Sequence, residues 1–240
     1  MALFRRRQRT PAANQAATTD DDAAPSPPPT VDVFADITCP FTHVGLQRVV
    51  PMLSSTGRAA VMYVKAWPLE WVNGQPLQYD AVASKSEALT AQLGGDSFRG
   101  LDAGSWPSTT IPALAMVANA YVADPATGLA LSIDLRRGLF ELGRDISDPD
   151  VLADYARSHA LHSAIGHKAR LDGEAIVRDD YEEGQRLGVD GSPHFFVGSS
   201  NFFCPALDIG HDADGALTAR LDTDGLDEFL SQLATPAEDG

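Results

Sequence analysis

The chain has 240 residues, 44% of them apolar, which is enough for one large domain or two small ones with a real core. Its 18 basic and 33 acidic side chains leave a formal charge of −15, which repels polyanions and argues against nucleic acid or an anionic membrane surface as the main partner. The only two cysteines, Cys39 and Cys204, exclude a disulfide-stapled secreted domain.

The first residues differ in composition from the rest of the chain. Residues 1–30 are biased toward Pro, Ala and Asp, which predicts a disordered tail. They contain no apolar run long enough for a signal peptide or a membrane span. We therefore expect a cytoplasmic protein whose folded part is one domain, residues 31–235.

The segment after the tail predicts a strand, a helix and a second strand. Residues 31–37 alternate between apolar and polar and then become apolar, which indicates a strand that enters a buried sheet. Apolar residues at helical spacing follow Cys39 until Pro51, which should kink or end this helix. Residues 59–67 are β-branched and aromatic, and so predict a parallel strand reached by a right-handed crossover.

Residues from about 76 to 187 predict a helical insertion. The segments with apolar residues three and four apart are 84–93, 111–123, 129–143, 148–161 and 174–188. Strand character returns at 194–198, followed by a turn at 199–201, an antiparallel partner at 202–209 and a closing helix at 223–234. The order β-α-β, helices, β-β-α predicts one α/β domain interrupted by a large, mostly helical insertion.

The stretch ITCPFTHVG, residues 37–45, carries the candidate nucleophile. Pro40 suits the first position of a helix, which makes Cys39 the expected N-cap, at the positive end of the helix dipole. This position favours the thiolate, the reactive form of cysteine. Thr42, three residues on, can donate a hydrogen bond to the sulfur but cannot form a disulfide.

A second motif, GVDGSPHFFV at residues 188–197, precedes the closing strands. Its glycine-rich approach to Ser192 and Pro193 is where a cis-proline could expose the preceding backbone beside the thiol.

With these motifs, the chain resembles the DsbA-like thioredoxin-fold family, and more closely its FrnE-like branch, to which 2-hydroxychromene-2-carboxylate isomerases and kappa-class glutathione transferases are related. The matching segments are FADITCPFTHVG, LFELGRDISDPDVLADYA and GVDGSPHFFVG, and the resemblance covers roughly Val31 to Leu233. It implies that Cys39 is the nucleophile and Pro193 the cis-proline. Thr42 departs from the family's second cysteine, so CPFT stands in place of the CxxC motif. The substrate-binding candidates are Pro40, Phe41, His43, Ser192 and His194.

A site with one sulfur leaves several functions open. Cys39 can perform monothiol or mixed-disulfide chemistry if a thiol in solution, such as glutathione or mycothiol, is the co-substrate. The alternatives are a glutathione-dependent isomerase or transferase, and a binding protein that has lost its chemistry. We expect no metal and no tightly bound cofactor. Cys204 is either a buried structural thiol or a resolving cysteine, which would need its Cα within about 7 Å of that of Cys39.

Other clusters have ordinary interpretations. His159, His162 and His167 lie near one another but lack a cysteine or carboxylate at ligand spacing, so we expect a solvated helix end. Four aromatic residues could line a groove beside the insertion, although such residues more often belong to the core: Trp67, Trp71, Trp106 and Tyr121.

Overall fold

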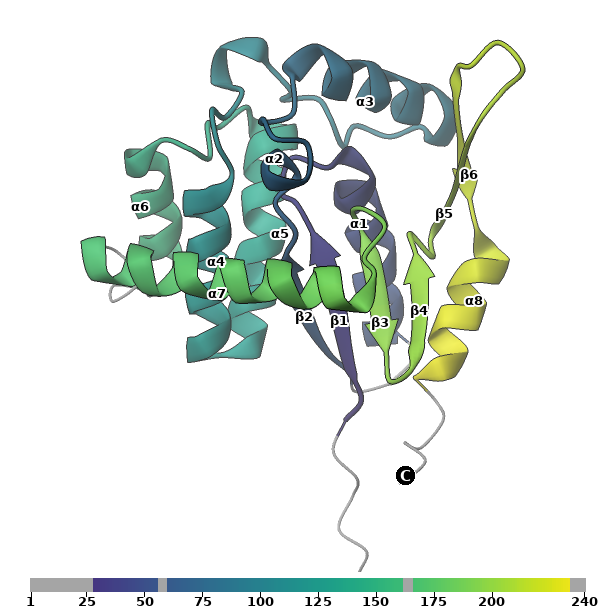
Figure 1. The fold of residues 1–240 in the computed structure, drawn as a ribbon. Helices are drawn as coiled ribbons and strands as arrows, with labels where there is room; N and C mark the ends of the chain where they lie inside the picture. The colour runs from purple at the N-terminus through teal and green to yellow at the C-terminus, as the bar shows by residue number, and fades with distance from the viewer. Residues whose placement is uncertain (1–27, 56–59, 162–165, 234–240) are drawn as a thin grey trace, which may run out of the picture.

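A computed structural model describes residues 28–55, 60–161 and 166–233 (Figure 1). Most of the predicted tail lies outside these residues. The strands are β1 (Thr30–Ala35), β2 (Val61–Ala66), β3 (His194–Val197), β4 (Ser200–Phe203), β5 (Leu207–His211) and β6 (Leu217–Leu221). The helices are α1 (Pro40–Ser55), α2 (Leu69–Val72), α3 (Tyr79–Leu93), the 3₁₀ helix η1 (Ala103–Ser105), α4 (Ile111–Ala123), α5 (Pro125–Leu142), α6 (Pro149–Ser158), α7 (His167–Leu187) and α8 (Thr223–Gln232).

The central sheet has four strands in the order β2-β1-β3-β4. β1 pairs with β2 in parallel, and β3 pairs antiparallel with both β1 and β4. The α1 crossover and the antiparallel return confirm the predicted thioredoxin-like arrangement of β-α-β followed by β-β-α.

The two faces of the sheet are covered by different helices, because β1 alternates its side chains between them (Figure 1). Val31, Val33 and Ala35 belong to a buried core that also contains apolar residues of α1 and α8. Phe34 points to the other face, where α7 crosses the sheet. α7 approaches closely because Gly184 has no side chain: a Cβ there would lie 2.6 Å from the ring of Trp67.

The helical insertion between β2 and β3 has its own core. α4 is almost entirely apolar, and it packs between α5 and α7. The insertion begins earlier than residue 76, because the short helix α2 already starts at Leu69. The five predicted helical segments correspond to α3 through α7.

Two local features differ from the expectations. Of the two outcomes expected at Pro51, an end of the helix does not occur, because α1 runs on to Ser55 with the proline inside it. The antiparallel partner of β3 occupies Ser200–Phe203 instead of residues 202–209, so two residues of the expected turn lie in the strand.

The chain leaves the central sheet at Cys204, which has a φ of 48°. Pro205, the next residue, has no N–H to continue the ladder, and Leu207 N–H donates to the Cys204 carbonyl across the resulting turn at 3.0 Å. β5 then pairs with β6 in a separate two-stranded sheet, a hairpin that we did not predict.

Candidate functional site

Cys39 lies at the start of α1, at the end of the sheet where β1 stops and β3 begins (Figure 1). The connection from β1 is a tight turn in which the Asp36 carboxylate accepts from the N–H and the hydroxyl of Thr38, at 2.7 and 2.6 Å. The Cys39 carbonyl accepts the first helical hydrogen bond, from His43 N–H at 3.2 Å. Pro40 is the first helical residue, so Cys39 occupies the expected N-cap position.

The loop before β3 approaches Cys39 from the far half of the chain. Its Ser192–Pro193 peptide bond is cis. The β1–β3 pairing ends at Phe34 and His194, because Pro193 has no N–H to offer to the ladder. The Ser192 hydroxyl instead accepts the next β1-side N–H, that of Asp36, at 2.9 Å. The Ser192 side chain thus bonds this loop to the segment between β1 and Cys39.

The Cys39 thiol faces this loop directly. Its Sγ donates to the Ser192 carbonyl at 3.0 Å, and the residue is only 3% exposed. The thiol therefore contacts the backbone that precedes the cis-proline, which is the juxtaposition expected from the two motifs. It is also shielded from solvent, so a disulfide substrate can reach it only after a local movement.

Thr42 is bound differently from the prediction. Its Oγ1 lies 2.8 Å from the Ser192 Oγ, in a fully buried position. Among the described residues this is its side-chain partner, and the expected hydrogen bond to the sulfur is not formed. A buried hydroxyl needs a partner, and the Ser192 hydroxyl, already held by Asp36, provides one.

The two flanking histidines are buried and engaged elsewhere. His43 Nε2 lies 3.0 Å from the Ser97 carbonyl, and its ring stacks on Phe140 with centroids 4.9 Å apart. Burial lowers the pKa of His43 to about 4, so this ring is neutral at pH 7. His194 accepts from the Asp190 N–H at 3.2 Å through Nδ1, while its Nε2 lies 3.1 Å from the Asn201 Oδ1. The structure therefore gives both rings a role in joining segments, and both are buried. Their role in substrate binding stays a prediction.

The other expected contact residues lie on the first turn of α1. Pro40 is buried, and Phe41 is partly exposed. The Lys85 ammonium of α3 lies 5.9 Å from the centroid of the Phe41 ring. Phe41 also packs against a small buried cluster that includes Leu89 of α3. α3 therefore covers the first turn of α1.

Cys204 is close to the site but deeply buried. It is 1% exposed, and its N–H donates to the Pro193 carbonyl at 3.1 Å, one peptide away from the carbonyl that holds Cys39. Both cysteines are free. Burial, and secondarily the nearby Cys39, raises the pKa of the Cys204 thiol. These properties favour the structural role for Cys204, because a resolving cysteine must attack as a thiolate.

Asp36 and Arg136 are two buried charged groups that sequence analysis missed. The Asp36 carboxylate accepts from Thr38 and also from the Leu69 N–H and the Thr110 hydroxyl, at 2.8 and 3.2 Å. Arg136 of α5 donates to the Asp36 carbonyl at 3.2 Å. The closeness of Asp36 to Cys39 was visible in the sequence, but nothing local indicated a contact with a residue a hundred positions away.

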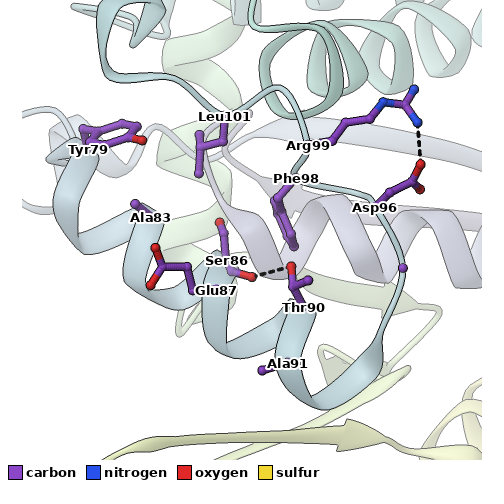
Figure 2. A pocket seen from close by; sticks show the side chains of 11 residues that line it. Tyr79, Ala83, Ser86, Glu87, Thr90, Ala91, Asp96, Phe98, Arg99 and Leu101 are labelled. Carbon is purple, nitrogen blue, oxygen red and sulfur yellow. Dashed lines mark hydrogen bonds and ion pairs between the residues drawn. The ribbon is translucent and has the colours of Figure 1, made fainter.

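A cavity of about 550 Å³ lies between one face of α3 and residues 95–101 (Figure 2). Ser86 and Phe98 are among the residues that line it, and the Phe98 ring also contacts the ring of His43. Cys39, Ser192 and Pro193 are not part of its lining, so the cavity is separate from the thiol.

The predicted aromatic groove is largely core packing. Trp67 is buried against Phe34 and Tyr181. The remaining three pack against the core of the insertion or bind the backbone: Trp71, Trp106 and Tyr121.

The histidine-rich stretch at the end of α6 has no metal-like arrangement in the part of the chain that is described. Within those residues, no three His, Cys, Asp or Glu side chains are grouped so that they could hold an ion. His159 is hydrogen-bonded to Asp134 at 3.1 Å, and His162 lies outside the described residues.

None of the described helices combines the length and the apolar character that a membrane crossing requires.

Together, the fold and the site define a thioredoxin-like protein with a cysteine at the start of its first helix, facing a cis-proline loop. A family model for the DSBA-like thioredoxin domain matches residues 30–213. The chain belongs to this family of DsbA-like thiol oxidoreductases, as the motifs predicted. In a comparison with curated proteins by sequence, none matched.

Solved structures with this fold include enzymes of different activities. The chain is similar to a probable DsbA oxidoreductase from Streptomyces coelicolor, with 18% identity, a TM-score of 0.62 and coverage of 88% of this chain and 93% of the other. The cytosolic disulfide reductase DsbM from Pseudomonas aeruginosa gives 17% identity, a TM-score of 0.55 and coverage of 85% and 98%. A 2-hydroxychromene-2-carboxylate isomerase gives 13% identity, a TM-score of 0.53 and coverage of 72% and 88%. At these identities the similarity establishes the fold alone.

Proposed function

We propose that this protein is a thiol oxidoreductase that works through a single nucleophilic cysteine, Cys39, and takes its resolving thiol from solution. One observation carries the proposal: the Cys39 sulfur lies 3.0 Å from the Ser192 carbonyl, at the cis-proline loop. The place where a second cysteine would stand holds Thr42, whose hydroxyl is bound to the same loop.

The reaction proceeds in two exchanges. The Cys39 thiolate attacks one sulfur of a mixed disulfide between a substrate and a low-molecular-weight thiol, and forms a bond to the sulfur of the small thiol. The substrate leaves as a thiolate and takes a proton from water. A second small thiol, as its thiolate, then attacks the adduct on Cys39. This step releases the small-molecule disulfide and restores the Cys39 thiolate. In sum, the mixed disulfide and one free small thiol become the free substrate thiol and the small-molecule disulfide.

The residues around the sulfur divide the remaining tasks. The α1 N-terminus favours the thiolate, and Ser192 and Pro193 position the partner sulfur. Phe41, which is partly exposed, offers surface beside it, whereas Pro40 is buried. Thr42 acts by holding Ser192 in place, which differs from the direct contact with sulfur that we first expected.

Glutathione and mycothiol are the two small thiols that suit this scheme. A structure of the DsbM reductase with GSH, again at 17% identity and a TM-score of 0.55, supports the choice of glutathione as the first probe. We place the reaction in the cytoplasm, where such thiols keep cysteines reduced.

A glutathione-dependent isomerase or transferase is the second candidate. The fold shared with the 2-hydroxychromene-2-carboxylate isomerase favours it, together with the single sulfur of the site. In that case Cys39 or Thr42 would steer the thiolate of glutathione, and glutathione would bind without exchanging its sulfur.

The test measures turnover of a glutathionylated peptide by the full chain with glutathione as reductant. We expect catalysis in the wild type and in Cys204→Ser, and loss of at least about a hundredfold in Cys39→Ser, which lacks the nucleophile. Saturable glutathione binding that protects Cys39 from alkylation, without turnover, would point to the isomerase or transferase. A Cys39 that neither turns over nor is protected would indicate a binding protein and would end the proposal.

A further inference from the structure

Arg136 is a buried cation beside the thiol site. It lies on α5, is 1% exposed, and has no carboxylate within ion-pair distance among the described residues. A buried guanidinium is expensive to desolvate unless hydrogen bonds or a negative charge compensate it. Its environment therefore needs a physical explanation.

Its hydrogen bonds join α5 to the segment that leads into α1. One amino group donates to the Ser132 carbonyl at 2.8 Å and to the Ser132 hydroxyl at 2.6 Å. The other donates to the Asp36 carbonyl at 3.2 Å, and Nε is buried without a partner. The guanidinium is thus bonded to its own helix through Ser132 and to the Asp36 carbonyl through its second amino group.

The Asp36 peptide connects this cation to the site. The Asp36 N–H donates to the Ser192 hydroxyl at 2.9 Å, and the Ser192 carbonyl accepts from the Cys39 thiol at 3.0 Å. Arg136 therefore lies behind the segment that fixes the cis-proline loop against the sulfur.

Arg136 is a buried cation close enough to Cys39 for their charges to interact, whereas Lys85 of α3, which lies over Phe41 near the first turn of α1, is exposed. Burial lowers the pKa of Arg136 to about 10, while the nearby Asp36, Cys39 and Tyr121 oppose that shift, so the guanidinium stays protonated at pH 7. The Asp36 carboxylate has four hydrogen bonds from neutral donors and is not bound to the guanidinium. Three titratable groups that interact with Arg136 or Cys39 are neutral at pH 7: His43 on α1 and Tyr121 on α4, near Arg136, and Cys204 after β4, near Cys39.

We propose that Arg136 is a positioning residue for the Cys39 thiol: it fixes the Asp36 peptide behind the cis-proline loop and supplies the buried positive charge that offsets Asp36 and favours the Cys39 thiolate. This inference rests on the proposed function, because a stabilised thiolate matters only if Cys39 reacts. It assigns Arg136, a residue of the helical insertion, to the thiol site.

The test measures the rate of Cys39 alkylation against pH in the full chain carrying Cys204→Ser. Arg136→Met and Arg136→Gln remove the charge, and Arg136→Lys keeps it. Arg137→Gln is the matched control, because Arg137 is the next residue of α5 and its side chain is 53% exposed. Circular dichroism and thermal unfolding show which variants are folded.

We expect the two neutral variants to raise the pH of half-maximal alkylation by about one unit, which corresponds to about tenfold less thiolate below the midpoint. Arg136→Lys should stay within about 0.3 units of the parent, because the charge remains. Arg137→Gln should match the parent. A folded neutral variant with the parental midpoint would overturn the inference.

If neither neutral variant folds, Arg136→Lys decides the question. A midpoint near that of the parent supports the inference, and a rise of about one unit overturns it. The proposed function is tested independently of this inference. It is wrong if the parent shows no glutathione-dependent turnover, even when the Arg136 variants have a shifted alkylation midpoint.

Discussion

Thr42 and Ser192 form a buried hydroxyl pair between the first turn of α1 and the cis-proline loop. Ser192 also accepts from the Asp36 N–H, so its side chain joins two segments that precede and follow Cys39. Removing the Ser192 hydroxyl takes away the partner of the buried Thr42 hydroxyl, which costs about 1–3 kcal/mol, whereas Ser192 keeps its bond from the Asp36 N–H when Thr42 is removed. Residue 42 thus makes a structural contact at the position where the CxxC motif has its second cysteine.

His43 gives a prediction about stability and pH. Its folded-state pKa of about 4 lies below the ordinary value of 6.5, because burial disfavours the charged ring. As the pH falls below about 6.5, the unfolded chain binds a proton that the folded chain refuses, so stability decreases as the pH falls toward 4. The destabilisation caused by His43→Gln should therefore shrink by about 2 kcal/mol between pH 7 and pH 5.

Urea unfolding at both pH values checks this prediction, with His167→Gln as the control because His167 is exposed. The free energy of unfolding of His43→Gln must be compared with that of the wild type at each pH, because Asp180 changes the stability of both proteins with pH in the opposite direction. Burial raises its pKa to about 6, so its contribution to stability falls as the pH rises from about 4 to 6. An equal effect of His43→Gln at both pH values would show that His43 is protonated normally in the fold.

The residues that carry the chemistry were predictable where the sequence signal is local. Cys39 next to Pro40, and Ser192 next to Pro193, identify both halves of the site. The partner of Thr42 was not predictable, because a hydroxyl one turn into a helix can reach either the sulfur or the loop. Arg136 gave no signal, since its meaning depends entirely on a contact across the fold.

At the scale of elements, we expect α3 to limit access to the thiol, because it packs over Phe41, two residues after Cys39. α3 packs over the first turn of α1, and it also lies beside β6 (Figure 1). The side chain of Gln92 is bonded to the backbone of β6. The Gln92 amide donates to the Leu217 carbonyl at 2.8 Å and accepts from the Ala219 N–H at 2.7 Å. It pairs with β6 as a neighbouring strand would.

Gln92→Ala should therefore loosen α3 and expose Cys39 more often. A loss of about 1 kcal/mol from the closed arrangement raises the open population about fivefold, and the alkylation rate of Cys39 should rise by the same factor. Gln185→Ala, on the exposed side of α7, is the matched control and should leave the rate unchanged. An unchanged rate in a folded Gln92→Ala variant would mean that access to Cys39 does not pass through α3.

Most helices and strands were predictable because the spacing of their apolar residues follows the period of a helix or a strand. The hairpin of β5 and β6 was missed because its strands are short and mostly exposed, so neither has a strong alternating pattern. The early end of β4 depends on the backbone conformation of Cys204, which the residue type does not disclose. The continuation of α1 through Pro51 reflects tertiary packing, since Val49 and Leu53 on either side are buried in the core.

At the scale of the whole molecule, two cores support one site. The first core lies under the sheet with α1 and α8, and the second fills the helical insertion. The thiol and the cis-proline belong to the sheet, whereas α3 and Arg136 belong to the insertion. The sequence predicted both parts, but the way in which the insertion reaches back to the thiol depends on contacts between distant segments.

The most direct measurement is mass spectrometry of the full chain, with Cys204→Ser, after exposure to excess glutathione disulfide. We expect one glutathione adduct on Cys39 that persists until free glutathione is added and is then removed. In the Thr42→Cys background, the same adduct should disappear without added thiol, because a cysteine one helical turn away can close a disulfide with Cys39. A Cys39 that stays unmodified, or an adduct that glutathione cannot remove, would contradict a catalytic cycle based on this one cysteine.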